Sequence, residues 1–160
     1  MSVSVFSTPA GWMGIRASGN GLTDIILPEP SEADVLRQFG VESAGDGSPF
    51  SDLIRRFRAY YSGQPVEFPD RLDLAGATPF QQAVWQAARR IPYGETRSYA
   101  WVAEQAGNPK AARATGGALG KNPLPVIVPC HRVISADGSL GGFTGGLDLK
   151  RRLLDIETGH

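Results

Sequence analysis

The first 27 residues alternate in short apolar and polar stretches, which turn-forming segments separate. Val3 to Phe6, Trp12 to Arg16 and Leu22 to Leu27 are therefore predicted to be strands. Proline and glycine in T-P-A-G at 8–11 and G-N-G at 19–21 favour turns between them. The beginning of the chain thus predicts a small set of consecutive strands.

Helical spacing replaces this alternation further along the chain. A short helix is predicted from Ser31 to Phe39, followed by a loop at 42–48. Ser48 is predicted to cap a second helix, with Pro49 at its first position and Gly63 at its end. Its apolar residues fall at helical spacing and are Phe50, Leu53, Ile54, Phe57 and Tyr61.

One more strand is expected at Leu72 and Leu74. With it, residues 1–77 predict a small N-terminal α/β domain, in which no chemically reactive cluster stands out.

The second half of the chain has a helical pattern and predicts a second domain over residues 78–160. T-P-F-Q at 78–81 is a capping box, Ser98 is placed to cap a helix that Gly107 closes, and Asn108 with Pro109 is placed to begin another. Two short helices joined by a glycine-containing turn fit a helix-turn-helix. The predicted helices span residues 78–90, 98–106, 108–119 and 148–157.

The helix predicted at 108–119 carries unusually small side chains, with two consecutive glycines at Gly116 and Gly117. Glycine destabilises a helix, so this composition needs a reason. Tight packing against a neighbouring helix is one reason and is favoured by the sequence. The other is close approach to a narrow surface such as the DNA minor groove, because a major-groove reader needs more long polar side chains than Lys110 and Arg113.

The formal charge of the 160-residue chain is zero, with 16 basic and 16 acidic side chains, which argues against a strongly basic nucleic-acid binder. The distribution is uneven: residues 1–88 carry a net charge of −4, residues 89–132 of +5 and residues 133–160 of −1. The positive stretch either faces a polyanion or forms an unevenly charged, solvated surface.

Several classes of protein are disfavoured by what the sequence contains. No apolar run reaches the roughly 18 residues of a membrane span, and the N-terminus does not resemble a signal peptide, so a cytoplasmic protein is expected. The single cysteine excludes an internal disulfide and a zinc site built from several cysteines. We expect neither a metal nor a cofactor.

The single cysteine lies in I-V-P-C-H-R-V at 127–133. Val126 to Val128 predict a buried strand that Pro129 ends, which places Cys130 at the strand end beside His131. A thiolate is a nucleophile, and a nearby base or positive charge activates it. His131 is expected to act through a water, because adjacent side chains rarely point the same way. The alternative is an inert buried cysteine.

Two neighbouring features bear on this site. Arg132 is predicted to be a buried cation that is paired to a carboxylate and holds the loop. The glycine-rich segment 135–146 permits close backbone approach and could wall a flat pocket with Phe143; the alternative is an ordinary surface loop.

P-C-H-R-V at 129–133, preceded by N-P-L-P at 122–125, resembles the active-site signature of the O6-alkylguanine-DNA alkyltransferases. The resemblance extends over the C-terminal half and includes R-S-Y at 97–99, G-N-P-K-A-A-R-A at 107–114 and L-L-D-I-E at 153–157. It implies an RNase H-like N-terminal α/β domain, followed by a mostly helical domain with a helix-turn-helix.

The resemblance also implies roles for individual residues. Cys130 matches the family's alkyl acceptor, and His131 and Glu157 match its partners, with a water between thiol and imidazole. Asn122 matches the asparagine that braces the active-site turn. Tyr99 matches the tyrosine that presses on the DNA backbone and donates a proton to the departing guanine.

Further matches concern DNA and the damaged base. Arg113 matches the arginine that fills the space left by a flipped nucleotide, and Lys110 is the other basic residue of that segment. Small residues would let the backbone approach the minor groove: Ala111, Ala112, Ala114 and Gly116. The implied alkylguanine pocket comprises Pro125, Val133, Phe143, Thr144 and Gly145.

The implied function is direct-reversal DNA repair, in which an alkyl group from O6 of guanine, and also from O4 of thymine, moves irreversibly to Cys130 in a single turnover. The implied partner is double-stranded DNA, bound by a monomer that can assemble cooperatively. Phe143 and Thr144 depart from the family's frequent tyrosine and serine, and the zinc of some relatives does not carry over.

Two other functions remain open from the residues alone. A helix-turn-helix protein could bind lesions without chemistry, and a cysteine hydrolase could act through a thioester with the Cys130, His131 and Glu157 set.

Overall fold

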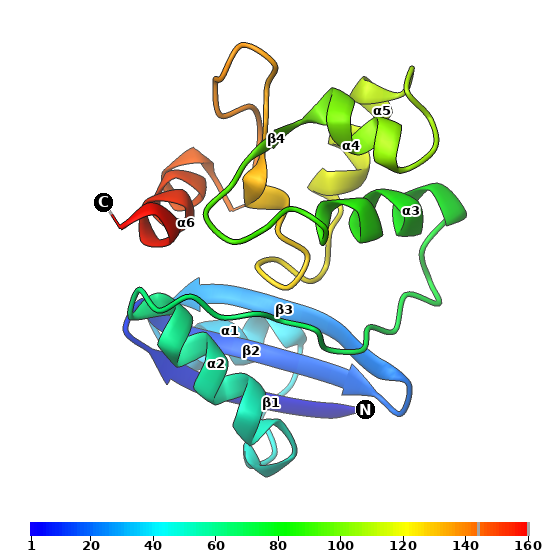
Figure 1. Cartoon of the computed structure of the whole chain (residues 1–160). Coiled ribbons are helices and arrows are strands. Elements are labelled where there is room, and N and C mark those ends of the chain that lie inside the picture. The colour runs from blue at the N-terminus through cyan, green and yellow to red at the C-terminus, as the bar shows by residue number, and fades with distance from the viewer. Residues whose placement is uncertain (144, 160) are drawn as a thin grey trace. The chain divides into compact units, whose positions relative to one another are not determined.

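The computed structural model describes residues 1–143 and 145–159 and has a mixed α/β fold (Figure 1). The chain divides into two compact units, Met1–Asp73 and Leu74–His160. Within the described residues, no helix is long and apolar enough to cross a membrane.

The first unit is built on a three-stranded antiparallel sheet with the order β1-β2-β3. The strands are β1 (Ser2–Thr8), β2 (Gly11–Ser18) and β3 (Gly21–Glu29), which confirms the three predicted strands and extends each. The strand expected at Leu72 and Leu74 is reduced to a single bridge between Leu72 and Leu22.

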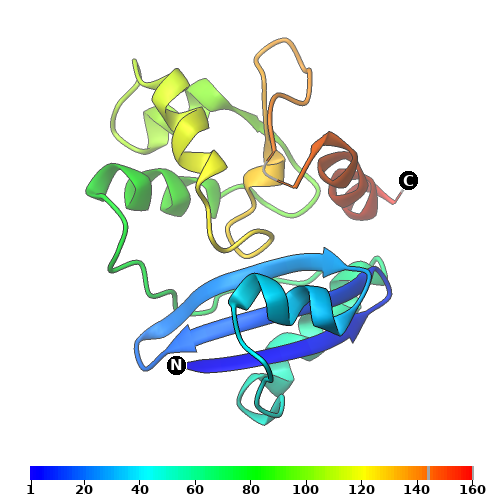
Figure 2. The same ribbon diagram turned by 180° about the vertical axis from the view of Figure 1, so that it is seen from behind.

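Helices α1 (Glu32–Phe39) and α2 (Ser51–Tyr61) cover opposite faces of this sheet (Figures 1 and 2). The short helix expected from Ser31 to Phe39 is confirmed, and the Ser31 side chain caps it by accepting from the Asp34 N–H. The prediction that Ser48 caps α2 is wrong. Ser48 begins a short 3-10 helix, η1 (Ser48–Phe50), and its own N–H and hydroxyl donate to Asp46.

The second unit is mostly helical and contains α3 (Pro79–Ala88), α4 (Tyr99–Gln105), α5 (Ala112–Gly120) and α6 (Leu147–Thr158). Both halves of the Thr78–Gln81 capping box are present, and Ser98 caps α4. The predicted start of the next helix is wrong: α5 begins at Ala112, because Asn108 closes a turn with Ala111 and caps no helix.

Helices α3, α4 and α5 pack on one another around a common core. The buried Trp85 of α3 donates its indole N–H to the Ala118 carbonyl of α5 over 2.9 Å. Val84, Val102 and Leu119 contribute apolar side chains from the three helices. This packing fixes α5 to the rest of the unit and leaves its other face exposed.

The segment before the cysteine is not the predicted strand. Val126 has a φ of 73°, and the Val128 N–H bonds back to the Leu124 carbonyl, so the apolar run folds into a buried turn. Cys130 then begins a short 3-10 helix, η2 (Cys130–Arg132). Beyond it, β5 (Val133–Ile134) pairs in parallel with β4 (Arg97–Ser98), which brings Tyr99 near the cysteine turn.

Candidate active site

The position of the Cys130 sulfur is fixed by the side chain of Asn122, which follows α5. Its amide Nδ2 lies 3.0 Å from the Val128 carbonyl oxygen and 3.2 Å from the Cys130 Sγ, while its Oδ1 accepts from the Leu124 N–H at 2.8 Å. One side chain therefore closes the turn and donates a hydrogen bond to the sulfur. This arrangement supports the bracing role that the resemblance implies.

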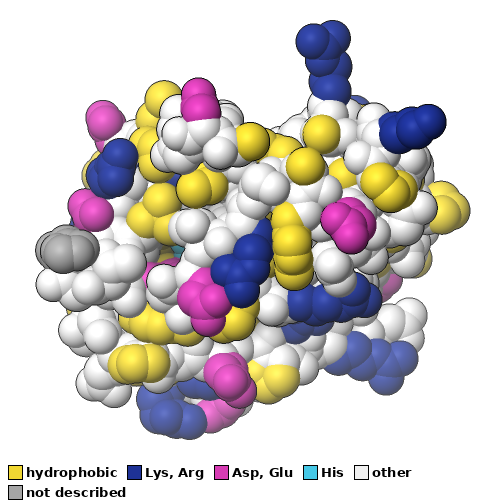
Figure 3. Space-filling model, turned by 45° about the horizontal axis from the view of Figure 1, so that its top comes forward, with side chains coloured by type: hydrophobic (Ala, Val, Ile, Leu, Met, Phe, Trp, Pro, Cys, Tyr) yellow, Lys and Arg dark blue, Asp and Glu magenta, His cyan; other side chains and the backbone are white. Residues whose placement is uncertain are grey.

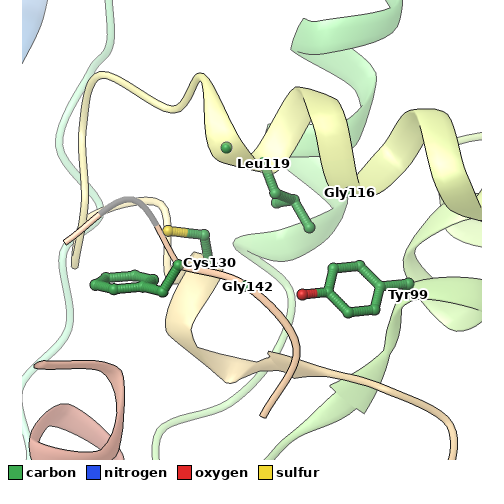
Figure 4. A pocket seen from close by; sticks show the side chains of 7 residues that line it. Tyr99, Gly116, Leu119, Cys130 and Gly142 are labelled. Atoms are coloured by element: carbon green, nitrogen blue, oxygen red, sulfur yellow. The ribbon is translucent and has the colours of Figure 1, made fainter. Parts of the chain in front are cut away.

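A pocket of about 410 Å³ opens beside the sulfur (Figure 4). Leu119 enters it from α5, and the Tyr99 ring lies across it with the hydroxyl toward the Cys130 side. The pocket is mostly apolar, and Leu119 is the large side chain among the three α5 residues that line it. Its lining residues are Tyr99, Gly116, Leu119, Gly120, Cys130, Gly142 and Phe143.

Behind the cysteine, His131 and Arg132 share the carboxylate of Glu157, from the last turn of α6. His131 Nε2 bonds Glu157 Oε2, and Arg132 donates to both carboxylate oxygens, with Nε 2.8 Å from Oε1 and Nη2 3.2 Å from Oε2. Arg132 also donates to the Ile91 carbonyl at 2.8 Å. The prediction that Arg132 is a buried cation paired to a carboxylate is confirmed.

These contacts set the charge states of the cluster. Burial alone would raise the pKa of Glu157, but hydrogen bonds from His131 and Arg132 lower it to about 2. Burial lowers the pKa of His131, against the opposing effect of Glu157. The imidazole is therefore neutral near pH 7, with its Nε2 proton directed at Glu157, which leaves Nδ1 as the nitrogen able to accept a proton.

The thiol itself is not activated in the resting protein, contrary to the expectation of a lowered pKa. Burial raises the pKa of Cys130, and the Asn122 hydrogen bond, the Lys150 charge and nearby backbone N–H groups only partly oppose this. A thiol of this kind needs a base to remove its proton when the reaction begins.

The bonds of Glu157 with His131 and Arg132 predict that the folded protein loses stability in acid. A carboxylate with a pKa of about 2, against its usual 4.5, stabilises the fold fully above pH 4.5, and this stabilisation is lost as the pH falls toward 2. The lowered pKa of His131 acts in the same direction from about pH 6.5 downward. The expected Glu157 contribution is on the order of 3 kcal/mol. Denaturant unfolding from pH 7 to 2.5 measures it, and Glu157→Gln should flatten the profile below pH 4.5. Parallel profiles for both proteins would contradict the assignment.

Tyr99, the first residue of α4, is held by the glycine-rich segment. Burial raises the pKa of its phenol, while the Gly142 backbone N–H bonds its oxygen. The approach is close: a Cβ on Gly141, which has a φ of +69°, would lie 2.5 Å from the Tyr99 hydroxyl. Glycine is required at position 141 both for its backbone conformation and for this contact.

The other residues expected in the base pocket are less closely associated with it. Pro125 and Val133 are buried and do not line the cavity, although Val133 follows Cys130 through η2. Gly145 is exposed, and Thr144 lies outside the described residues. Phe143 lines the pocket as expected.

The exposed face of α5 carries Arg113, Ala114 and Gly117, with Lys110 exposed just before the helix. Ala111 and Ala112 at its start are half-buried. Figure 3 shows basic side chains standing clear of the surface where α4 and α5 lie. A Cβ on Gly116 would meet only the Tyr99 ring at 3.8 Å, and one on Gly117 nothing within 4 Å. Helix packing therefore requires neither glycine, which favours the alternative of a surface that another molecule approaches closely.

The sequence interpretation missed Lys150. Its side chain is fully buried, and its ammonium donates to the carbonyls of Val133 at 2.7 Å, Gly142 at 3.1 Å and Leu140. Its spacing in the sequence indicated this burial, because Lys150 lies on the same face of α6 as the buried Leu153 and Glu157. No group of three or more potential metal ligands occurs among residues 1–143 and 145–159.

Known proteins resemble this chain along most of its length. Residues 79–159 match the family model described as 6-O-methylguanine DNA methyltransferase, DNA binding domain. A methylated-DNA–protein-cysteine methyltransferase of Mycobacterium leprae is 45% identical and covers 94% of this chain and 88% of its own length. One of Methanosarcina acetivorans is 39% identical and covers 98% of both.

The fold has a solved counterpart as well. The Mycobacterium tuberculosis protein OGT, whose crystal structure was determined in complex with DNA, superposes with a TM-score of 0.82 at 41% identity, covering 99% of this chain and 94% of that one. With the similarity extending through both units and across the cysteine turn, the chain belongs to the methylated-DNA–protein-cysteine methyltransferase family.

Proposed function

We propose that this protein repairs DNA directly, by moving the alkyl group from O6 of guanine onto the sulfur of Cys130. The observation that carries the proposal is the position of the only cysteine. Its Sγ borders a pocket of about 410 Å³, receives a hydrogen bond from Asn122 and is adjacent to the buried His131–Glu157 pair. A flat base can enter beside Phe143, with the alkyl carbon directed at the sulfur.

The residues account for each bond change. The thiol proton passes to His131 Nδ1 through a water, and Glu157 stabilises the imidazolium. The thiolate attacks the alkyl carbon, so that the sulfur–carbon bond forms as the carbon–O6 bond breaks. Tyr99 supplies a proton to the departing guanine and recovers one from the imidazolium. The net result is a thioether on Cys130 and an unmodified guanine.

DNA binding is assigned to α4 and α5, as a helix-turn-helix in which α5 faces the minor groove. Its exposed small residues suit close approach, and Arg113 is the long side chain able to fill the gap left by a flipped nucleotide. Flipping is needed because a thiolate cannot reach O6 of a stacked, paired guanine in line. O4-alkylthymine, another flat base with an exocyclic alkyl oxygen, is a second substrate.

The remaining assignments concern the whole chain. Residues 1–77 form an RNase H-like domain, and residues 78–160 form the DNA-binding and alkyl-acceptor domain. The protein binds duplex DNA as a monomer, with cooperative assembly along the strand, and acts in the cytoplasm. None of the steps above requires a metal or a cofactor.

The direct test is intact-mass measurement after mixing with duplex DNA that contains O6-methylguanine. The protein should gain one methyl group, on the peptide that contains Cys130, and Cys130→Ser should gain none while still binding the DNA. DNA binding without a mass change in the unmodified protein would identify a lesion-binding module. Continued turnover of an ester substrate would identify a hydrolase.

Arg113 is expected to matter only where a nucleotide must be flipped. Arg113→Ala should slow repair in duplex DNA and leave the reaction with free O6-alkylguanine base nearly unchanged, because the free base needs no flipping. Rates on the two substrates measure this, with Arg151→Ala, an exposed arginine on α6, as the control. Equal losses on both substrates would refute the role. Affinity for DNA should also fall as salt rises.

Gly141 should be needed for proton donation by Tyr99. Gly141→Ala would drive a methyl group into the Tyr99 hydroxyl, and displacing a reacting group by about 1 Å can cost about 10²-fold in rate. Gly138→Ala is the matched control, because Gly138 also has a positive φ, +86°, but open space around its Cβ position. Single-turnover rates should fall only for the first variant. A similar loss in both would mean that backbone strain alone is responsible.

A further inference from the structure

Lys150 is a buried cation for which the reaction above has no use. Its side chain is 0% exposed, and none of the ion pairs among the described residues includes it. An ammonium buried without a carboxylate is costly. Such groups are retained more often at functional sites than elsewhere.

The three acceptors of its ammonium come from two segments of the chain, and one of them, Gly142, lines the pocket. Val133 lies in β5, directly after the η2 turn that carries Cys130. Leu140 and Gly142 lie in the glycine-rich segment 135–146. The Gly142 N–H in turn bonds the Tyr99 oxygen, and Lys150 Nζ lies 5.9 Å from the centre of the Tyr99 ring. One side chain thus joins the cysteine turn, the segment 135–146 and the tyrosine.

We propose that Lys150 is a positioning residue for alkyl transfer, which clamps the segment 135–146 onto β5 and so holds Tyr99 and Cys130 at the separation that a base between them requires. This inference rests on the proposed function for its catalytic consequence, although the clamp itself is independent of it. Backbone hydrogen bonds of Ser135 with Ser139 and Gly138 close the first half of the segment. Lys150 is the side chain that ties Leu140 and Gly142 to Val133.

The charge of Lys150 has a second effect at the sulfur. It favours the thiolate of Cys130 and so opposes the rise in pKa that burial causes. The titratable groups around it are the Cys130 thiol and the Tyr99 phenol, with the His131–Glu157–Arg132 cluster behind the thiol. Removing the ammonium should therefore loosen the segment and also raise the pKa of the thiol.

The experiment compares Lys150→Met, which keeps the length of the side chain, with Lys150→Arg, which keeps its charge. Arg151→Met is the matched control, since it removes an exposed cation from the next position of α6. Three properties are measured on each full-length protein: amide hydrogen exchange of residues 138–143, the pH midpoint of Cys130 alkylation by iodoacetamide, and single-turnover methyl transfer from DNA.

In Lys150→Met, we expect faster exchange at Gly142, a higher pH midpoint, and transfer slower by about 10²-fold, the usual cost of misplacing reacting groups by 1 Å. In Lys150→Arg, the midpoint should stay near that of the unmodified protein, because the charge is retained. Arg151→Met should match the unmodified protein in all three properties.

The inference is overturned if Lys150→Met leaves both hydrogen exchange and the alkylation midpoint unchanged, or if it transfers methyl groups at the original rate. If Lys150→Met lowers the melting temperature, measurements well below the new midpoint keep these comparisons valid. A failure of the proposed function is recognised separately, because the unmodified protein would then acquire no methyl group while the exchange and alkylation results still report on the clamp.

Discussion

Glu157→Gln is expected to slow alkyl transfer by about 10²–10⁴-fold, the usual range for loss of general-base catalysis. In the proposed mechanism, Glu157, which bonds His131 Nε2, holds the imidazole proton on that nitrogen and stabilises the imidazolium that forms when the thiol is deprotonated. An amide provides no negative charge for either purpose. Single-turnover rates on methylated duplex DNA measure the loss, and affinity for the DNA should change little, because Glu157 is buried away from the surface of α5.

Glu157 also bonds Arg132 and the Gly94 N–H, so this variant should be less stable as well. Rates must therefore be compared at a temperature where the variant is fully folded. Asp155→Asn, which removes a carboxylate from the same helix, is the control. If Glu157→Gln reacts at the original rate across neutral pH, Glu157 only anchors the end of α6.

Each molecule is expected to react once. The bond formed is a thioether, which lacks the carbonyl carbon that lets water cleave a thioester, and the chain contains no second thiol. A titration of the protein with excess methylated DNA should therefore stop at one equivalent of repaired guanine per chain. Product that accumulates well beyond one equivalent would exclude the single-use mechanism.

The alkylated protein should also be less stable than the free protein. Asn122 donates to the sulfur over 3.2 Å, and a thioether is a weak acceptor, while the added methyl group crowds a site where overpacking costs about 1–3 kcal/mol. A melting curve of the titrated protein should show a midpoint lower by several degrees. A loss of 1 kcal/mol corresponds to about 4–8 °C in a domain of roughly 60–100 residues. An unchanged midpoint would contradict the strain at Asn122.

Features with local causes were predictable from the sequence. Ser31, Thr78 and Ser98 cap helices because each side chain reaches an N–H three residues away, and sequence neighbours alone decide this contact. The motif around Cys130 was likewise visible. Asn108 is an exception among these polar residues. Its carbonyl closes a turn with the Ala111 N–H, its side chain caps no helix, and α5 begins three residues later than expected.

Features that depend on distant contacts were not predictable. The apolar run Val126 to Val128 looks like a strand, but Asn122 closes it into a turn through bonds to Leu124 and Val128. The chain also gives no sign that Arg97 and Val133 pair in a parallel bridge. Lys150 was missed because a lysine is expected on a solvated helix face. Its spacing from Leu153 and Glu157 indicated the buried face of α6, but its carbonyl partners come from distant segments that the sequence does not reveal.

The left-handed conformation of Val126 determines when the site acquires its shape. A β-branched residue with a φ of 73° is strained by roughly 1–3 kcal/mol, and the surrounding core must supply that energy while the chain folds. The cysteine turn is therefore assembled before any DNA arrives, and binding does not have to organise it. In the function proposed above, the energy of DNA binding then remains available for flipping the damaged nucleotide, a step that the folded protein cannot prepare in advance.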